Sequence, residues 1–174
     1  MKFTHNELCT IGERYLRVTL GCKVTAKELT AFTKHGEIPD VLGFTTDNSY
    51  LLECKASRSD FLSDKKKLFR KYPDRGMGEF RYYVCPTGLI DRKELPEKWG
   101  LIYVNARGKC RMVYGYNPKH SMAYDKHMRY NQRKKAYKFE YCMQSERAML
   151  FSMARRMVFN GMVFNGEWKY KEKA

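Results

Sequence analysis

Three residues with the chemistry of a metal-dependent hydrolase lie near one another in the chain. Asp40 follows a proline, and Glu53 and Lys55 flank Cys54 a short distance further on. Two carboxylates suit Mg²⁺ or Mn²⁺, which prefer shells of oxygen ligands. Such a cation would lower the pKa of a bound water and offset charge on a phosphodiester, while an adjacent lysine could orient the water, help it lose a proton or contact the phosphate. These residue types therefore indicate phosphodiester hydrolysis.

A β-hairpin is expected to bring the three residues together. Residues 37–44 and 49–56 have the composition of strands, and the intervening Asp47-Asn48 predicts a two-residue turn. Counting outward from that turn places Asp40 opposite Lys55. Glu53 is then the diagonal neighbour of Asp40 on the same face. A turn with an odd number of residues would break this arrangement.

Period-two alternation also puts Glu53 and Lys55 on one face of their strand, while Cys54 points to the other face. Asp40 and Glu53 are then close enough to share one hard cation. A simpler interpretation stays open, in which Asp40 and Lys55 form a cross-strand ion pair beside a chance glutamate.

The elements around the hairpin predict a mixed α/β or α+β core over residues 1–116. Apolar residues at helical spacing indicate a first helix over residues 6–19, and a second helix is expected to begin at Ser57 and to end at Pro73. Runs of strand-like composition occupy residues 23–32, 37–44, 49–56, 80–85 and 101–104. This order predicts a central mixed sheet flanked by helices.

Residues 117–174 differ in character and are expected to form a basic, aromatic and mostly helical extension packed on the core. Residues 119–141 interleave lysines and arginines with tyrosines, and residues 144–158 predict a helix. One face of that helix should pack on the core through Met149, Leu150, Met153 and Met157. The direct repeat of Met-Val-Phe-Asn-Gly at 157–161 and 162–166 has no mechanism that we can assign.

Composition narrows the class of partner. The 174 residues include 34 Lys and Arg against 19 Asp and Glu, which gives a formal net charge of +15 and favours a polyanionic partner such as nucleic acid. The sequence shows neither a membrane-spanning apolar segment nor a secretory signal, so a soluble, cytoplasmic protein is expected. The six scattered cysteines predict reduced, mostly buried thiols rather than disulfides or structural zinc.

These residues resemble the P-D…(D/E)-x-K signature of the PD-(D/E)XK nuclease superfamily. The longer run from Glu53 to Lys66, E-C-K-A-S-R-S-D-F-L-S-D-K-K, looks like the E-x-K-x-S-R-x-D-F-x-x-D-x-K pattern of the MmcB-like DNA-repair and phage nuclease branch. The resemblance covers residues 5–105 and does not extend over the carboxy-terminal third. It implies a restriction-endonuclease-like core with a central mixed sheet.

The resemblance also implies roles for individual residues. Mg²⁺, for which Mn²⁺ would substitute, would be held by Asp40, Glu53 and the backbone carbonyl of Cys54, and Lys55 would be the catalytic lysine. The acid on the family's first helix corresponds to Glu7 or Glu13, of which Glu7 fits the pattern better. The expected function is therefore Mg²⁺-dependent hydrolysis of DNA in repair, recombination or phage DNA processing.

Two groups of basic residues are candidates for contact with DNA. Arg58, Lys65 and Arg70 match recurrent positions after the E-x-K, on a helix that contacts either phosphates or solvent, and the carboxy-terminal segment adds Arg133, Lys134 and Lys135. A non-catalytic DNA-binding or repair-scaffold protein and an RNA-binding protein remain alternatives. The sequence is compatible with a monomer or a homodimer.

Overall fold

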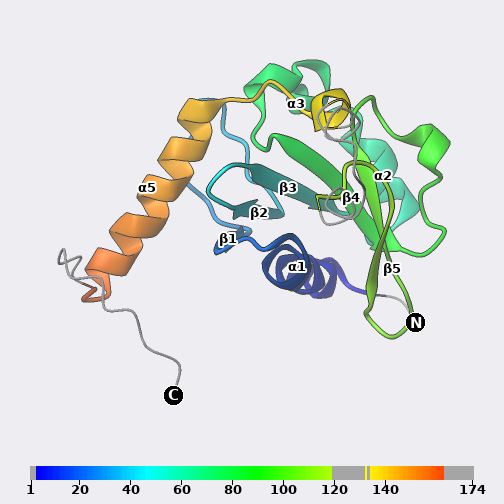
Figure 1. Cartoon of the computed structure of the whole chain (residues 1–174), viewed down its shortest axis with the longest axis horizontal. Helices are drawn as coiled ribbons and strands as arrows, with labels where there is room; N and C mark the ends of the chain where they lie inside the picture. The colour runs from blue at the N-terminus through cyan, green and yellow to red at the C-terminus, as the bar shows by residue number, and fades with distance from the viewer. Residues whose placement is uncertain (1–2, 119–131, 133, 163–174) are drawn as a thin grey trace.

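The computed structural model of the chain describes residues 3–118, 132 and 134–162. Its centre is one open, six-stranded sheet in which the strands follow one another in chain order (Figure 1). The β3–β4 and β4–β5 pairs are parallel and the other three pairs are antiparallel. The strands are β1 (Val24–Lys27), β2 (Val41–Phe44), β3 (Ser49–Cys54), β4 (Phe80–Pro86), β5 (Gly100–Val104) and β6 (Cys110–Tyr114). The expected mixed sheet with flanking helices, an α+β fold, is confirmed.

The first helix, α1 (His5–Tyr15), begins at a capping box. Thr4 Oγ1 accepts a hydrogen bond from the backbone N–H of Glu7, and the Glu7 carboxylate accepts one from the backbone N–H of Thr4. This exchange satisfies two backbone donors that the start of a helix would otherwise leave free. The helix continues as the π-turn η1 (Leu16–Leu20) and ends at Gly21, whose φ of 79° suits glycine.

The sheet has an apolar layer on each face. Tyr50, Leu52 and Cys54 of β3 pack against α1, whereas Leu51 of the same strand packs on the other face with Phe61. This is the period-two alternation of a strand buried on both sides. Glu53 and Lys55 therefore belong to the face of Leu51, opposite to α1.

Three short helical segments follow β3 where the sequence predicted one helix. They are α2 (Arg58–Asp64), α3 (Leu68–Lys71) and the 3₁₀ turn η2 (Pro73–Arg75). The predicted start is confirmed, because Ser57 is the N-cap of α2 and accepts a hydrogen bond from the backbone N–H of Asp60. The predicted continuity is wrong: the chain leaves the helix around Lys67, whose ψ of 140° is extended. This break directs the Lys67 ammonium group to the buried carboxylates behind it.

The carboxy-terminal part beyond residue 116 contributes to the core. The helix α5 (Met143–Phe159) matches the predicted helix, and Phe139 and Met149 belong to the apolar layer that also contains Phe61. Glu146 is buried and accepts hydrogen bonds from Ser49 Oγ and the backbone N–H of Gly78, both at 2.7 Å. The extension is therefore packed on the core at the start of α5.

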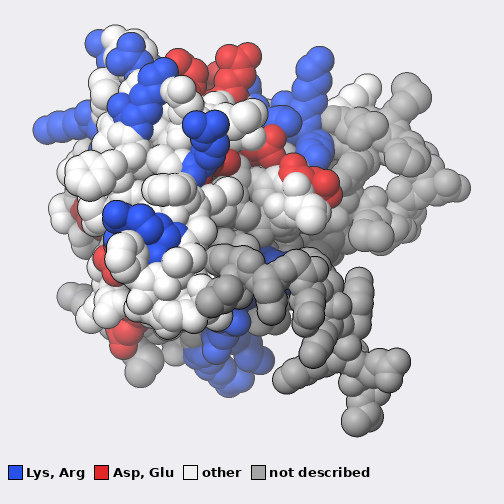
Figure 2. Space-filling model, turned by 90° about the vertical axis from the view of Figure 1, so that its left-hand side faces the viewer, with Lys and Arg blue, Asp and Glu red and all other residues white. Residues whose placement is uncertain are grey.

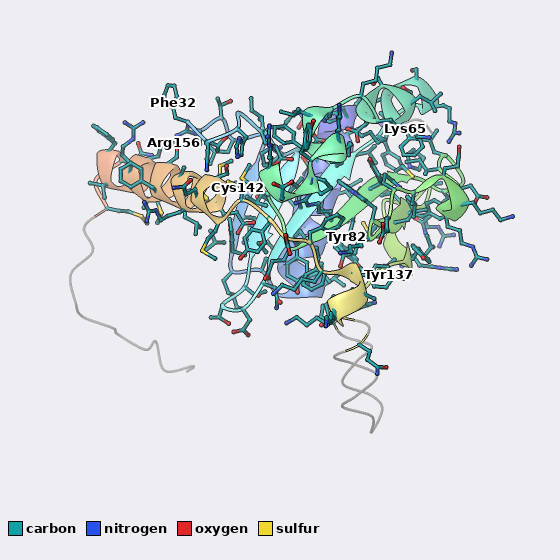
Figure 3. The ribbon with its side chains drawn as sticks, turned by 90° about the horizontal axis from the view of Figure 1, so that it is seen from above. Phe32, Lys65, Tyr82, Tyr137, Cys142 and Arg156 are labelled. Atoms are coloured by element: carbon teal, nitrogen blue, oxygen red, sulfur yellow. The ribbon has the colours of Figure 1, made fainter. Side chains whose placement is uncertain are left out.

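The outer half of α5 does not pack as predicted. The helix projects away from the sheet (Figure 1), and Leu150 and Met157 of the expected apolar face are exposed. Arg156 lies beside the loop that carries Phe32 (Figure 3) and donates a 2.9 Å hydrogen bond to the carbonyl of Thr30. The second copy of the pentapeptide repeat lies outside the described residues after Met162. Another short 3₁₀ turn, η3 (Arg92–Glu94), and the strand β6 were not predicted.

Candidate active site at the end of strands β2 and β3

Glu53 and Lys55 lie side by side at the end of β3, as the spacing predicted. They are 1% and 2% exposed, and Lys55 Nζ is 3.0 Å from Glu53 Oε2. The intervening Cys54 packs on the opposite face with α1. Removing two charges from water is costly, and one ion pair seldom offsets that cost without further partners. This pair belongs to a larger network of buried charges.

Asp40 lies just before β2, next to this pair, but in a different register from the prediction. Phe44 pairs with Ser49 across a four-residue loop, stabilised by the hydrogen bond from the Thr45 N–H to the Asn48 carbonyl. The predicted position of the turn at Asp47-Asn48, which would set Lys55 opposite Asp40, is therefore wrong. Because Val41 pairs with Leu52, the same register places Asp40 opposite Glu53.

The error in register is two residues, an even number, so it does not change the common face of Glu53 and Lys55. Asp40 itself precedes β2, and its carboxylate lies at the strand ends, within 4.8 Å of ligand atoms of Cys9 and Cys54. The Asp40 carboxylate is 15% exposed, and its Oδ2 accepts a 2.7 Å hydrogen bond from the backbone N–H of Cys54. The N–H of Lys55 instead donates to the carbonyl of Val84 in β4. Since successive residues of a strand direct their N–H and C=O to opposite sides, this pattern places the Cys54 carbonyl on the side of Asp40.

Three cations contact one oxygen of Glu53. Glu53 Oε2 lies 3.0 Å from Lys55 Nζ, 2.9 Å from Lys67 Nζ and 3.4 Å from an Arg70 guanidinium nitrogen. The Lys55 and Arg70 side chains are buried, whereas that of Lys67 is 43% exposed. Lys67 is therefore the cation that an incoming ligand can displace most easily.

Asp64, at the end of α2, is the second buried carboxylate of this network. Its Oδ1 lies 3.0 Å from both Lys55 Nζ and Lys67 Nζ. Its Oδ2 accepts hydrogen bonds of 2.6 Å from Arg70 Nε and from the hydroxyl of Tyr83 in β4. Two carboxylates and three cations thus share one buried cluster between β3 and the α2–α3 segment.

The network sets the ionisation of its members. Burial and the neighbouring charge of Glu53 raise the pKa of Asp40 to about 6. Burial alone would lower the pKa of Lys55, but the negative charges of Glu53 and Asp64 outweigh it and raise that pKa. Burial opposes ionisation of Asp64 as well, yet Arg70 and Lys55 hold its pKa well below the ordinary value. Lys55 is therefore an ammonium ion at neutral pH.

Arg70 does not lie on an exposed helical face, where the sequence predicted it. Its side chain is 5% exposed, and its guanidinium carbon lies 4.3 Å from the centroid of the Trp99 ring. The break between α2 and α3 turns this arginine inward, onto Asp64 and Glu53. It pairs there with the carboxylates of the cluster, and its contact with DNA stays a prediction.

The first helix brings His5, rather than Glu7 or Glu13, to Asp40. His5 Nε2 is 3.6 Å from Asp40 Oδ1. Glu7 is exposed and its carboxylate is used in the capping box, which lowers its pKa through hydrogen bonds with Thr4. Glu13 accepts a 2.9 Å hydrogen bond from Thr25 Oγ1. The structure therefore gives no support to a catalytic role for Glu7.

The other predicted contacts to DNA lie in several places. Arg58 pairs with Glu94 and donates to the carbonyl of Leu89, whereas Lys65 lies at the outer end of α2 (Figure 3), 5.5 Å from the ring centroid of Phe61. Of the carboxy-terminal basic residues, Lys135 is exposed, Lys134 is half-buried, and Arg133 lies outside the described residues. On the face shown in Figure 2, the described lysines and arginines stand in separate groups among acidic and neutral side chains.

Sequence reasoning gave no role to Asp64, Lys67, Tyr83 or His5. Asp64 lies within the run that carries the family resemblance, so its position was the available signal. Tyr83 lies in β4 and contributes because the parallel pairing of β3 with β4 sets it opposite Glu53. No local pattern encodes that pairing.

Comparison with known proteins identifies a shared fold. No protein-family model matches the chain, and no curated protein is significantly similar to it. Among solved structures, the chain is similar to a protein of unknown function from Silicibacter pomeroyi, with a TM-score of 0.54 and 18% sequence identity over 92% of this chain and 94% of that chain. At this level of identity the likeness shows a shared fold over nearly the whole length of both chains. No described helix has the length and apolarity that a membrane span requires.

Proposed function

We propose that this protein is a Mg²⁺-dependent nuclease of the PD-(D/E)XK superfamily that hydrolyses phosphodiester bonds in DNA. The observation that carries the proposal is the meeting of Asp40, Glu53 and Lys55 at adjacent strand ends, with both carboxylates partly or fully removed from water. Buried carboxylates whose negative charges oppose one another are typical of sites that hold a cation. DNA repair, recombination or phage DNA processing would supply such a substrate.

The donor set fits a small, hard cation. Asp40 and Glu53 offer carboxylate oxygens, and the strand pattern places the Cys54 carbonyl on the Asp40 side. The ion pairs that Glu53 makes with other described residues all involve its Oε2 atom. When bound, Mg²⁺ would supply Lewis acidity, which lowers the pKa of a water molecule and offsets charge on the phosphate.

Lys55 acts as a cation and hydrogen-bond donor in this proposal. Its raised pKa keeps it protonated at neutral pH, so it cannot accept a proton from the attacking water. Its ammonium group can instead orient that water or stabilise negative charge on the phosphate. Lys67, exposed on the same cluster, can leave Glu53 and contact the phosphate backbone. The net charge of +15 would attract the DNA.

The cellular setting follows from the substrate. DNA and six free cysteines, four of them buried, fit a reducing cytoplasm of a bacterial or phage-infected cell. A homodimer is compatible with the proposal, because two subunits would supply one active site for each strand of a duplex.

One observation favours a non-catalytic alternative. Because three cations already neutralise Glu53, the cluster could be a structural network in a DNA-binding scaffold that keeps the fold. An RNA-binding protein is the third candidate, since the positive charge alone does not distinguish RNA from DNA.

The deciding experiment compares cleavage of linear, nicked and branched DNA and of RNA by purified protein with Mg²⁺, Mn²⁺, Ca²⁺ or EDTA. We expect DNA cleavage with Mg²⁺ or Mn²⁺, none in EDTA, and none by Glu53→Gln. The matched control is Glu97→Gln, which makes the same change of charge at an exposed position and should cut normally. DNA binding without metal-dependent cleavage supports the scaffold, preferential RNA binding supports the third candidate, and full activity of Glu53→Gln excludes this site.

A further inference from the structure

A second group of metal-ligand side chains lies on the other side of Asp40, where α1 crosses the ends of β2 and β3. His5 and Cys9 are four residues apart on α1 and therefore project from the same face of the helix. Cys9 Sγ is 3.3 Å from His5 Nε2. Ligand atoms of Cys9, Asp40 and Cys54 all lie within 4.8 Å of one another, as do those of His5, Cys9 and Glu28.

This group is separate from the Glu53 cluster. The Cys54 side chain packs on the α1 face of the sheet, whereas Glu53 and Lys55 belong to the opposite face. Both thiols are fully buried, and the His5 side chain, 40% exposed, lies at the outer edge of the group. Asp40 lies at the strand ends, between the two sites, and its carboxylate is a candidate ligand in both.

The spacing of the donor atoms fits a four-coordinate transition metal. Metal bonds of about 2.0 Å to nitrogen or oxygen and about 2.3 Å to sulfur, at tetrahedral angles, place neighbouring donors about 3.3–3.8 Å apart. The His5–Cys9 contact of 3.3 Å and the 3.6 Å from His5 Nε2 to Asp40 Oδ1 match this spacing. His5 and Cys54 belong to different groups of donors within 4.8 Å, so closing the shell brings them closer together, and the 40% exposed His5 side chain has room to move.

The identity of the donors specifies the class of metal. Two cysteine sulfurs and an imidazole are soft or borderline ligands that select Zn²⁺ and its relatives over Mg²⁺, which prefers oxygen. Asp40 Oδ2 also accepts the hydrogen bond from the Cys54 N–H, an interaction that holds the carboxylate in place. Glu28 Oε1, 3.5 Å from His5 Nε2, is a second carboxylate at the rim.

We propose that His5, Cys9, Cys54 and Asp40 form a Zn²⁺-class metal site that joins α1 to the ends of β2 and β3. Coordination of one Zn²⁺ by two thiols releases one proton from each sulfur and leaves two thiolate ligands. The site goes beyond the proposed nuclease function, because only the Asp40 carboxylate among its four side-chain donors is also a proposed Mg²⁺ ligand. Its main consequence is mechanical: it fixes the position of Asp40 relative to the first helix.

The test uses Co²⁺ as a spectroscopic probe and the full chain, without DNA. Co²⁺ bound by thiolates shows a sulfur-to-metal charge-transfer band, and four-coordinate Co²⁺ shows intense visible bands. We expect both with the reduced wild-type protein at one ion per chain, and displacement of the bands by Zn²⁺. The charge-transfer band should be lost in the Cys9→Ser, Cys54→Ser double variant and retained in Cys110→Ser, the control at a half-buried cysteine outside the group.

His5→Gln keeps the test decisive if the serine variants do not fold, because this side chain is partly exposed. It should weaken Zn²⁺ affinity by about 100-fold or more, since loss of even a residue behind a metal ligand costs about 10- to 100-fold. Absence of a thiolate band in the reduced wild type, unchanged affinity in His5→Gln, or a band that survives the loss of both cysteines would overturn the proposal. Glu53→Gln should keep the cobalt spectrum while losing cleavage, which separates failure of this site from failure of the nuclease proposal.

Discussion

Replacement of Asp40 by asparagine should stabilise the metal-free protein while weakening the metal site. The folded pKa of Asp40 is about 6, against an ordinary value of 3.8, chiefly because burial disfavours the charged form and because Glu53 repels it. Between these two pH values the folded state binds more protons than the unfolded state, so this group makes stability fall as pH rises through the window. Above about pH 7 the whole unfavourable contribution is present.

The magnitude follows from the size of the shift. A difference of about 2 pKa units, from 3.8 to about 6, corresponds to about 3 kcal/mol at about 1.4 kcal/mol per unit. Asparagine carries no charge, and its amide oxygen can still accept the hydrogen bond from the Cys54 N–H. Asp40→Asn should therefore raise the free energy of unfolding by about 1–3 kcal/mol at neutral to alkaline pH.

The assay is urea unfolding of wild type and variant in EDTA at about pH 8 and about pH 4.5, where the advantage of the variant should shrink to about a third of its value at the higher pH. Asp47→Asn, the same change in the exposed loop of the same hairpin, is the control and should alter stability by less than about 0.5 kcal/mol. Mn²⁺ should then stabilise wild type more than Asp40→Asn, because only wild type keeps the full set of ligands. A variant that is less stable than wild type in EDTA at the higher pH would refute the reasoning and favour a stabilising ion pair at Asp40.

Four further outcomes are expected. Mg²⁺ and Mn²⁺ should support DNA cleavage, whereas Ca²⁺, with longer bonds and looser geometry, should support binding with little turnover, as measured on one labelled duplex. Alanine at Arg133, Lys134 and Lys135 should reduce the slope of log affinity against log salt by about 0.7–0.9 for each phosphate that the protein no longer neutralises, and an unchanged slope would make this segment a solvated surface. Lys55→Ala should lower the free energy of unfolding by about 3 kcal/mol, since it removes a cation from two buried carboxylates, and an effect below about 1 kcal/mol would contradict the buried network. Glu37→Gln should stabilise the protein at about pH 8 but not at about pH 4.5, because burial raises the pKa of this carboxyl to about 7 and deprotonation destabilises the folded state above that value.

The hairpin shows where prediction from the sequence succeeded and where it stopped. Alternation along β3 is a local property, so the common face of Glu53 and Lys55 and the opposite orientation of Cys54 could be predicted. The register depends on the loop, which is centred on Thr46 and Asp47 because Thr45 and Asn48 are joined by hydrogen bonds on either side of them. Composition alone suggested a turn one residue later, at Asp47 and Asn48.

The single helix expected after Ser57 illustrates a second limit. Its cap was encoded locally, in a serine whose side chain meets the N–H three residues later. Its break was not, because Lys67 leaves the helix at the point where its ammonium group reaches Glu53 and Asp64. A long-range attraction between buried charges thus competes with local helical preference.

The sequence by itself determined the residue types of the candidate site, the strand that carries Glu53 and Lys55, the cap of the helix that begins after Ser57, and the faces on which Glu53, Cys54 and Lys55 emerge. These depend on neighbours along the chain, through period-two alternation and short-range hydrogen bonds. Only the tertiary structure decided that Arg70 turns inward onto Glu53 and Asp64, and that His5 and Cys9 of α1 meet Asp40 and Cys54. Those contacts join segments distant in sequence, and they form only when packing of both sheet faces brings the helices onto the strand ends.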